Sequence, residues 1–523
     1  MNELNTNFYQ NWQLRKPAVR GGGGVVSSHF RTAAQAGAEV LRAGGNAVDA
    51  AIATSFAVSV VEPWMSGLGG CGYMLIYLAQ EDRVRCIDFG AVAPAALDPS
   101  DYPLVEGEGG DIFTWPAVRD DANVHGYRSM ATPGQLDGVG LAWERYGTKP
   151  WADLLAPAIT LAERGLPVNW MTTIRVASAM VDLRRYAASA QIYLPDARPP
   201  LPDVGKPVPH LPLGGMANTL KRLAQAGHRD LYEGEVAARI IADIEAGGGS
   251  LRAADLAQYR AREVDPLMRD YGPARVFAAP GLTAGPTLFR VLDAIGGKIG
   301  AGTPGPAAYA QWARAMSDAY AERFRTMGAE DDSRAPGSTT HLCVIDADGN
   351  MVTLTQTLLS VFGSKTVLPQ TGILMNNGIL WFDPVPGKPN SMAPSKRPLS
   401  NMCPMLATRD GKPWFALGAS GGRRIMPAVM QVASMLIDGA MDFEDAFHQP
   451  RIDVSGDGRA TLDMRLDDGV VAAIEAHMPV FREEQSVYPN AFAKPNGVMR
   501  DPDTGAFLGV GDIMNPVAGA VGA

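Results

Sequence analysis

Two threonines that flank a tight turn have the type and spacing to share one chemical task. Residues 340–346 and 351–357 alternate like paired strands around Asp348-Gly349, which is a strong turn signal. A loop over residues 347–349 places Thr339 opposite Thr357, with their Cβ atoms about 5 Å apart. Such a pair could be a nucleophile and its supporting hydroxyl. Threonine is also a common strand residue, so this pattern alone leaves an ordinary threonine-rich strand open.

Two glycine-containing motifs suggest other chemistries. Residues 418–422 read Gly-Ala-Ser-Gly-Gly between a predicted strand and a predicted helix, like a nucleophile elbow whose last glycine comes one position early. Residues 67–72 match GxGxxG, but the dinucleotide fingerprint needs a strand before it and a helix after it, and here that order is reversed. We therefore interpret 67–72 as a tight helix-to-strand connection and keep Ser420 as an alternative nucleophile.

The sequence offers no pattern for a metal or redox centre. The seven histidines show no HxxxH or HxH spacing, and the four cysteines, at positions 71, 86, 343 and 403, form no CxxC pair. We expect no metal and no cofactor, and we expect the cysteines to be buried, reduced thiols.

The elements that must position these residues are helices followed by strands and then helices again. Strands are predicted over 73–78, 83–89, 404–408 and 412–418, with a helix from Gly421 to Ile437. Two alanine-rich helices over 25–61 should be separated by Ala43-Gly44-Gly45-Asn46. Further helices are predicted at 133–146, 151–164, 168–190, 215–227, 234–246, 253–260 and 305–326. This order favours a layered α/β protein with antiparallel sheets.

Length and composition limit the function classes. The chain has 523 residues, 46% of them hydrophobic, and a net charge of −9, which argues against nucleic acid and anionic lipid as partners. No apolar run reaches the roughly 18 residues of a membrane span. Residues 1–20 lack the apolar stretch of a secretory signal, so we expect a cytoplasmic protein.

Several long segments resemble the γ-glutamyltranspeptidases, a family of N-terminal-nucleophile hydrolases. The similar segments are 44–77, 132–147, 338–364 (STTHLCVIDADGNMVTLTQTLLSVFGS), 372–377 (GILMNN), 396–406 (KRPLSNMCPML) and 418–425 (GASGGRRI). They follow the family's order and cover nearly the whole chain. The resemblance implies a four-layer αββα sandwich with two stacked, mostly antiparallel sheets.

The resemblance also implies a self-cleaving precursor. Thr339 matches the family's nucleophile, which attacks the carbonyl of Ser338 and divides the chain into a large subunit, 1–338, and a small subunit, 339–523. The cut frees an α-amino group with a pKa near 8, which can act as a base at neutral pH. The acidic segment 327–338, MGAEDDSRAPGS, suits such a cut.

Three further catalytic residues follow from the same resemblance. Thr357 matches the second threonine of the family, whose hydroxyl holds the new amino terminus. Gly421 and Gly422 match the oxyanion hole, where backbone N–H groups face the developing negative charge.

The residues that grip a γ-glutamyl group in typical members are mostly replaced here. An arginine is replaced by Gly90, an asparagine by Leu359, a glutamine or glutamate by Gly378, an aspartate by Trp381, and one of two serines by Asn401, leaving Ser400. Losing charge-assisted contacts costs about 1.5–3 kcal/mol each, so ordinary glutamyl binding should be lost. A small anionic substrate would need a cation, for which Arg423, Arg424 and Lys365 are candidates.

Three hypotheses follow. The first is a self-cleaving threonine amidohydrolase acting on a small amide that is not a γ-glutamyl compound, such as oxamate or another acyl amide, as in oxamate amidohydrolases and cephalosporin acylases. The second is a glutathione hydrolase or transpeptidase with a rearranged pocket. The third is a non-catalytic binding protein on the same scaffold. The expected partners are the amide and the two subunits of the precursor, with a dimer of such pairs as a possibility.

Overall fold

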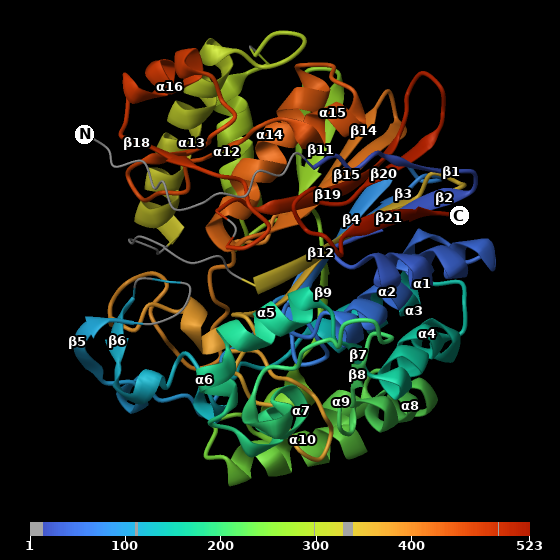
Figure 1. The fold of residues 1–523 in the computed structure, drawn as a ribbon, viewed down its shortest axis with the longest axis vertical. Helices are drawn as coiled ribbons and strands as arrows, with labels where there is room; N and C mark the ends of the chain where they lie inside the picture. The colour runs from blue at the N-terminus through green and yellow to red at the C-terminus, as the bar shows by residue number, and fades with distance from the viewer. Residues whose placement is uncertain (1–13, 110–112, 114, 298, 328–337, 490) are drawn as a thin grey trace.

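Two antiparallel sheets lie face to face between two layers of helices (Figure 1). The structure is a computed structural model, and it describes residues 14–109, 113, 115–297, 299–327, 338–489 and 491–523. In Figure 1 helices α12, α13 and α14 lie above the sheets, and helices α1 to α4 lie below them. The four-layer αββα arrangement expected from the sequence is therefore confirmed.

Each sheet has seven strands. The strands of the first sheet, here sheet I, are in spatial order β1 (Val19–Gly21), β20 (Phe507–Val510), β19 (Lys494–Arg500), β15 (Lys412–Ser420), β14 (Met405–Arg409), β11 (Ala274–Ala278) and β10 (Leu267–Tyr271). Those of the second, sheet II, are β21 (Gly519–Gly522), β2 (Gly24–Ser28), β12 (Ser338–Asp346), β13 (Met351–Leu359), β3 (Cys71–Leu78), β4 (Arg83–Phe89) and β9 (Arg262–Val264).

The helices surround these sheets. Helices α12 (Gly285–Ile295), α13 (Pro306–Met327), α14 (Ile425–Ile437), α15 (Phe443–His448) and α16 (Asp468–Glu475) lie on the side of sheet I. The side of sheet II carries α1 (Arg31–Arg42), α2 (Ala47–Val61), α3 (Gln135–Tyr146), α4 (Trp151–Arg164), α5 (Trp170–Ser178), α6 (Met180–Leu183), α7 (Ala187–Tyr193), α8 (Met216–Ala226), α9 (Asp230–Glu233), α10 (Glu235–Ala246) and α11 (Ala253–Gln258). Smaller sheets contain β5 (Leu104–Glu108) with β6 (Pro116–Val118), β7 (Leu166–Pro167) with β8 (His210–Leu211), and β16 (Ile452–Asp453), β17 (Ala460–Asp463) and β18 (Val480–Glu483).

Three of the predicted helices differ from the structure. Residues 24–28 are the buried strand β2 rather than helix, because the run Val25-Val26 pairs with β12 in the middle of sheet II. The predicted helix 168–190 is divided into α5, α6 and part of α7, with extended backbone at Tyr186. The helix expected from Gly421 begins at Ile425, because Gly421 has φ +140° and residues 422–424 form a 3₁₀ turn.

The Ala43–Asn46 break between α1 and α2 is confirmed, and its mechanism is a cap. The Asn46 side chain accepts a hydrogen bond from the Asp49 backbone N–H, and the Asp49 carboxylate accepts one from the Asn46 N–H. This reciprocal capping box fixes where α2 starts. Every residue of α2 is buried, which explains its nearly continuous apolar sequence.

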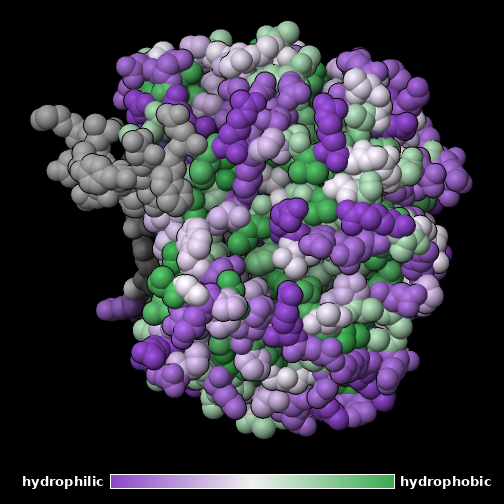
Figure 2. Space-filling model, turned by 45° about the vertical axis from the view of Figure 1, so that its right-hand side comes forward, coloured by the Kyte–Doolittle hydropathy of each residue, from purple (hydrophilic) through white to green (hydrophobic). Residues whose placement is uncertain are grey.

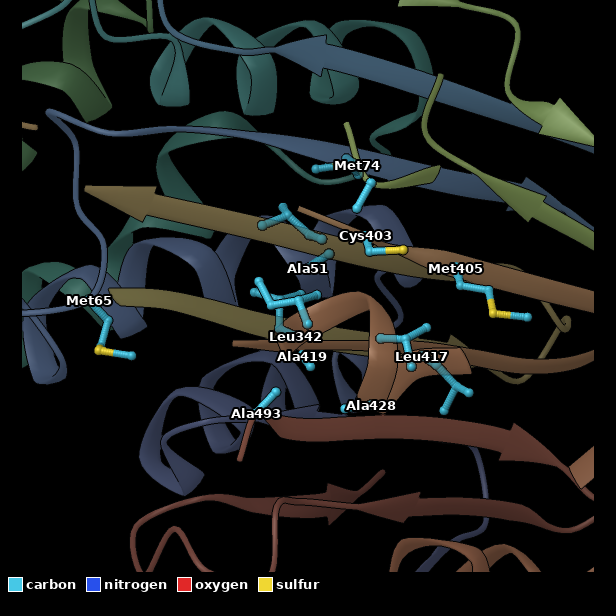
Figure 3. Close-up of a cluster of buried hydrophobic side chains, with 14 of the residues drawn as sticks. Ala51, Met65, Met74, Leu342, Cys403, Met405, Leu417, Ala419, Ala428 and Ala493 are labelled. Carbon is cyan, nitrogen blue, oxygen red and sulfur yellow. The ribbon is translucent and has the colours of Figure 1, made fainter. Parts of the chain in front are cut away.

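Side chains alternate along each sheet strand between a helix layer and the other sheet. Leu342 of β12 packs in the same cluster as Ala51 of α2, and Leu417 of β15 packs with Ala428 of α14 (Figure 3). The alternate residues of β12, such as Cys343, pack between the two sheets. All four cysteines are buried and free, as expected.

The surface shown in Figure 2 is mainly polar, with apolar side chains scattered in small groups. Among the described helices, none combines the length and apolar character that a membrane crossing requires.

Candidate active site

Thr339 and Thr357 meet at one end of sheet II, as the sequence predicts. The Thr339 Oγ1 atom lies 3.4 Å from the Thr357 Oγ1 atom, and both side chains are buried. From Thr340 to Ile345 the register of β12 against β13 is the predicted one, with His341 opposite Thr355. The pairing shifts between Ser338 and Thr340, so Thr339 lies at a β-bulge. A bulge re-aims a side chain and ends regular pairing, which suits a residue that must react.

Thr357 is held by its own backbone surroundings. Its Oγ1 atom accepts a 2.8 Å hydrogen bond from the Leu359 N–H. The same oxygen accepts the 3.4 Å hydrogen bond from the Thr339 hydroxyl. The Leu359 N–H, from the same strand, therefore helps to fix the position of the Thr357 oxygen beside Thr339.

His341, three residues after Ser338, joins the two sheets. Its Nδ1 atom lies 2.8 Å from Thr355 Oγ1 and its Nε2 atom 3.0 Å from Thr353 Oγ1. A Cβ atom on Gly418 of β15 would lie 2.0 Å from the ring, so the imidazole packs directly on the opposite sheet. Burial holds the pKa of His341 well below its ordinary value, and the ring stays neutral. These contacts make His341 a structural spacer that keeps the start of β12 in place.

A group of buried ionisable side chains lies behind Thr339. Thr340 Oγ1 donates a 2.7 Å hydrogen bond to Glu62 Oε2, which follows α2. Burial raises the pKa of Glu62 to about 7 and lowers the pKa of Lys494 to about 8. His29 Nε2 lies 2.9 Å from the Lys494 carbonyl oxygen, and burial lowers the pKa of His29 to about 3.

Gly421 and Gly422 directly follow β15. This strand of sheet I contacts β12 and β13 of sheet II, the strands that carry Thr339 and Thr357. The φ angles of the two glycines, +140° and +61°, lie in the region that favours glycine. A Cβ atom on Gly421 would lie 2.8 Å from the Ala493 Cα atom. Both the backbone angle and this close approach therefore require glycine at position 421.

The residues that replace the glutamyl grip are buried, and two of them, Leu359 and Trp381, belong to the same apolar cluster. Leu359, Gly378 and Trp381 are all buried, and the Gly378 N–H donates a 2.8 Å hydrogen bond to Asn376 Oδ1. Leu359 has φ +83°, a backbone conformation that asparagine adopts more readily than leucine. The fuller and more apolar substrate pocket expected from the sequence stays a prediction.

Ser400 and Asn401 are held by a buried arginine. Arg323 Nη2 donates a 2.7 Å hydrogen bond to the Ser400 carbonyl and a 3.2 Å bond to Asn401 Oδ1. The Ser400 Oγ atom accepts a 3.2 Å bond from the Met402 N–H. Both residues therefore have roles in holding their own loop.

The three cations considered for a substrate carboxylate are already engaged. Arg423 lies over the Phe324 ring, 4.8 Å from its centroid. Arg424 is 3.6 Å from Asp453, and Lys365 Nζ donates a 2.6 Å hydrogen bond to the Val361 carbonyl.

A different arginine occupies the neighbourhood of the missing one. Arg397 Nη1 donates a 3.0 Å hydrogen bond to the Gly90 carbonyl and lies 3.2 Å from Asp88 Oδ1. A Cβ atom on Gly90 would lie 2.8 Å from Tyr73 Oη and 3.3 Å from Arg397 Nη1. An arginine at position 90 would therefore have to displace Arg397 and Tyr73.

Sequence reasoning missed Glu62, Arg175, Arg397 and Lys494 as members of this region. Only Glu62 and Arg397 lie inside segments that carry the family resemblance, and no pattern of spacing marks the other two. The alternative nucleophile Ser420 is buried at the end of β15, and no described histidine bonds to it. The predicted processing segment lies outside the described residues over 328–337.

The interpretation of residues 67–72 as a tight connection is confirmed. They join α2 to β3, and Cβ atoms on Gly70 and Gly72 would lie 2.5 Å from the Thr357 carbonyl and 2.2 Å from the Thr355 carbonyl. These glycines let β3 approach β13 closely beside the candidate site.

The amino-acid sequence is similar to those of known proteins. The gamma-glutamyltranspeptidase family model matches residues 33–336 and 305–521. The Acylase ACY 1 proenzyme of Pseudomonas sp. (strain V22) is 34% identical over 499 residues, which cover 88% of each chain. The glutathione hydrolase proenzyme of Escherichia coli (strain K12) is 30% identical, covering 83% of this chain and 81% of its own.

Solved structures agree with the sequence relatives. A cephalosporin acylase from Bacillus halodurans superposes with a TM-score of 0.84 at 26% identity and covers 98% of both chains. The γ-glutamyltranspeptidase of Helicobacter pylori has a TM-score of 0.53 at 27% identity, covering 61% of this chain and 88% of that one.

Proposed function

Because the chain belongs to the γ-glutamyltranspeptidase family of N-terminal-nucleophile amide hydrolases, we propose that it is a precursor that cuts itself before Thr339 and then hydrolyses an amide outside the γ-glutamyl class. The single observation that carries the proposal is the placement of the Thr339 hydroxyl, buried at a bulge and 3.4 Å from the Thr357 hydroxyl.

Maturation would proceed by an N-to-O acyl shift. The Thr339 Oγ1 atom attacks the Ser338 carbonyl carbon, the peptide C–N bond breaks, and an ester joins Ser338 to the Thr339 oxygen. Water then hydrolyses the ester, which leaves a carboxylate on Ser338 and a free α-amino group on Thr339. The products are subunits 1–338 and 339–523, and relatives named proenzymes support such a step.

Turnover would use the same hydroxyl again. The α-amino group of Thr339 accepts the hydroxyl proton as Oγ1 attacks the substrate carbonyl, and the N–H groups of Gly421 and Gly422 would stabilise the oxyanion. The amine returns the proton to the leaving nitrogen, the amide C–N bond breaks, and water hydrolyses the acyl ester. Nucleophile and base lie on one residue, so the mechanism requires no histidine.

The substrate class is proposed from the residues that surround the nucleophile. Buried Leu359 and Trp381 stand where the family has an asparagine and an aspartate, so no anion on these positions can hold a substrate ammonium group. A small acyl amide without that group, of the oxamate or acylase type, fits this apolar cluster better than a glutamyl zwitterion.

A second candidate retains γ-glutamyl substrates in a rearranged pocket. The observation that favours it is Arg397, whose guanidinium lies beside Gly90 and could replace the family's arginine. That guanidinium already forms an ion pair with Asp88 and lies 5.9 Å from the ring centroid of Tyr259, which weakens this candidate.

The test combines a denaturing gel with an amide screen. Purified wild-type protein should resolve into two chains, and the small one should begin Thr-Thr-His by mass spectrometry, whereas Thr339→Ala should remain at 55.5 kDa. Ammonia or amine release should then identify the amide. Rapid turnover of a chromogenic γ-glutamyl anilide would favour the second candidate, and a wild-type chain that is never cut would favour a binding protein.

A further inference from the structure

Two buried cations near the start of β12 have no hydrogen-bond acceptor among the residues that the structure describes. Lys494 is 5% exposed and Arg175 is 8% exposed. Among the described residues, neither head group donates a hydrogen bond or enters a salt bridge, and the Arg175 Nε atom is a buried donor without a partner. Burying an unpaired charge is costly, so such a pair calls for a ligand or a specific role.

The position of Lys494 is fixed by the pairing of β19 with β15 in sheet I. Its backbone pairs with Ser420, the residue before Gly421, and its carbonyl lies 2.9 Å from His29 Nε2. Two residues along the same face of β19, Asn496 donates a 2.7 Å hydrogen bond to the His341 carbonyl. Because alternate residues share a face, the Lys494 side chain also points from sheet I toward the beginning of β12.

Arg175 approaches the same place from the helix layer. It lies on α5, and in Figure 1 this helix runs just below the start of β12. Its charge interacts with that of Glu62, whose carboxylate is bonded to Thr340. The ring of Tyr488 lies 5.8 Å from the guanidinium carbon.

The surrounding charges do not neutralise these two. The acids nearby are Glu62 and Asp512, and the other cations are Lys16 and Arg451. Lys16 Nζ donates to the carbonyls of Asp512, Asn515 and Ala518, and Arg451 donates to those of Phe447 and Ala493. Lys494 and Arg175 are therefore the two cations of this group whose head groups have no hydrogen-bond acceptor among the described residues.

Lys494 lies on the side of Thr339 opposite the replaced glutamyl grip, and Arg175 interacts with Glu62, which is bonded to the next residue, Thr340. In sheet II, β13, β3 and β4 lie on one side of β12 and carry Leu359 and Gly90 at their ends. On the other side lies β2, whose end leads to His29 and hence to Lys494. An amide that reacts at Thr339 has an acyl half and an amine half, and the two halves must lie on different sides of the nucleophile.

We propose that Lys494 and Arg175 bind a carboxylate on the amine half of the substrate, so that the enzyme releases an amino-carboxylic acid. This inference rests on the proposed function, in which the family's grip side takes the acyl group. The hydrolysis is the one written above: the amide C–N bond breaks, the leaving nitrogen takes the proton from the Thr339 amine, and its carboxylate stays between the two cations until release.

The test uses two amines of equal shape, 4-aminobenzoate and its uncharged analogue 4-aminobenzamide, as probes of the wild-type enzyme. Isothermal titration calorimetry should show about tenfold tighter binding of the carboxylate, as expected for one charge-assisted contact. Arg175→Gln and Lys494→Gln should each reduce this preference toward equality, and Arg175→Lys should retain part of it. Arg222→Gln is the control, because that guanidinium is already paired with Asp230 at 2.8 Å.

A kinetic measurement determines whether the carboxylate that these cations bind lies on the amine half of the substrate. For the acyl group found in the amide screen, kcat/KM should be higher for the 4-aminobenzoate amide than for the 4-aminobenzamide amide, and this ratio should fall in the two glutamine variants. Equal binding of both probes by the wild-type protein would overturn the inference. The inference would also be overturned if the glutamine variants lost selectivity only for substrates with a carboxylate on the acyl half.

The two proposals can fail separately. A wild-type chain that stays uncut on a denaturing gel contradicts the proposed function, while the binding preference still decides the inference without any turnover. A cut and active enzyme that binds both probes equally retains the function and contradicts the inference. If a glutamine variant does not fold, the wild-type preference and Arg175→Lys still give the answer.

Discussion

At the residue scale, the hydroxyl of Thr357 should contribute to both cleavage and turnover. Thr357→Val keeps the shape but removes the oxygen that lies 3.4 Å from Thr339 Oγ1 and accepts the Leu359 N–H. We expect both rates to fall roughly 100-fold, as for the loss of one positioned polar group in an active site. The rates are read from a time course on a denaturing gel and from amine release.

Thr357→Ser is the matched control for that experiment, because it keeps the hydroxyl and should keep most of both rates. If the valine variant matures and turns over at the wild-type rate, then the pairing of the two threonines is structural only.

The buried carboxyl of Glu62 predicts a pH effect on stability. Its pKa is raised from 4.5 to about 7 by burial, so the folded protein disfavours the ionised form. The free energy of unfolding should therefore fall as the pH rises from about 4.5 to about 7, by up to about 3 kcal/mol from this group. Glu62→Gln keeps an acceptor for Thr340 and should remove this part of the slope.

Denaturant unfolding of both proteins across that pH range measures the difference directly, since other acids titrate equally in each. Identical slopes for the wild type and Glu62→Gln would show that Glu62 does not carry the effect.

Residue types and spacing predicted part of the site. The alternating strands around Asp348-Gly349 were sufficient to place Thr339 against Thr357, since hairpin register follows from the loop. They could not predict the bulge at Thr339. Lys494 and Arg175 reach the same place from β19 and α5 through contacts between distant parts of the chain, and no local pattern encodes such contacts.

At the element scale, the junction between β15 and α14 depends on Gly421. Gly421→Ala should destabilise the fold by roughly 1–3 kcal/mol, because alanine meets both the unfavourable φ of +140° and the Ala493 backbone at 2.8 Å. Maturation should slow as well, because the following N–H groups would be displaced. Chemical unfolding and a cleavage time course give the two readouts.

Gly281→Ala is the control for this junction. Gly281 also has a positive φ, +69°, but a Cβ atom there would meet no atom within 4 Å. Its cost should be limited to the backbone term of roughly 1–2 kcal/mol, with normal maturation. Equal effects of the two substitutions on maturation would contradict the special role of Gly421.

Strong local signals explain which elements were predictable. The hairpins and α2 carry turn and cap signals, and all of them are found in the structure. No element was predicted over residues 261–304, which contain β9, β10, β11 and α12, and the sequence of β2 resembled that of the helix that follows it. Short buried strands have the same apolar composition as buried helices, and only their partners distinguish them.

At the scale of the whole molecule, the two proposed subunits share both sheets. In sheet II, β12 and β13 of the segment 339–523 lie between β2 and β3 of the segment 1–338, and in sheet I the later segment contributes four strands between β1 and β11. We therefore expect the cut chains to elute together by size-exclusion chromatography and to separate only in denaturant. Separate elution of the two chains under native conditions would contradict this arrangement.

The interleaved strands also bear on whether the chain folds before or after it is cut. The strands of the two segments can pair in this alternating order while one covalent chain joins them, so we expect folding to precede the proposed cut. Once scission has happened, that covalent link is gone, and a heat-unfolded enzyme should not regain its shape. An uncut Thr339→Ala chain should do so. Unfolding of the cut enzyme would then be irreversible, and the time for which it stays active would be set by its unfolding rate.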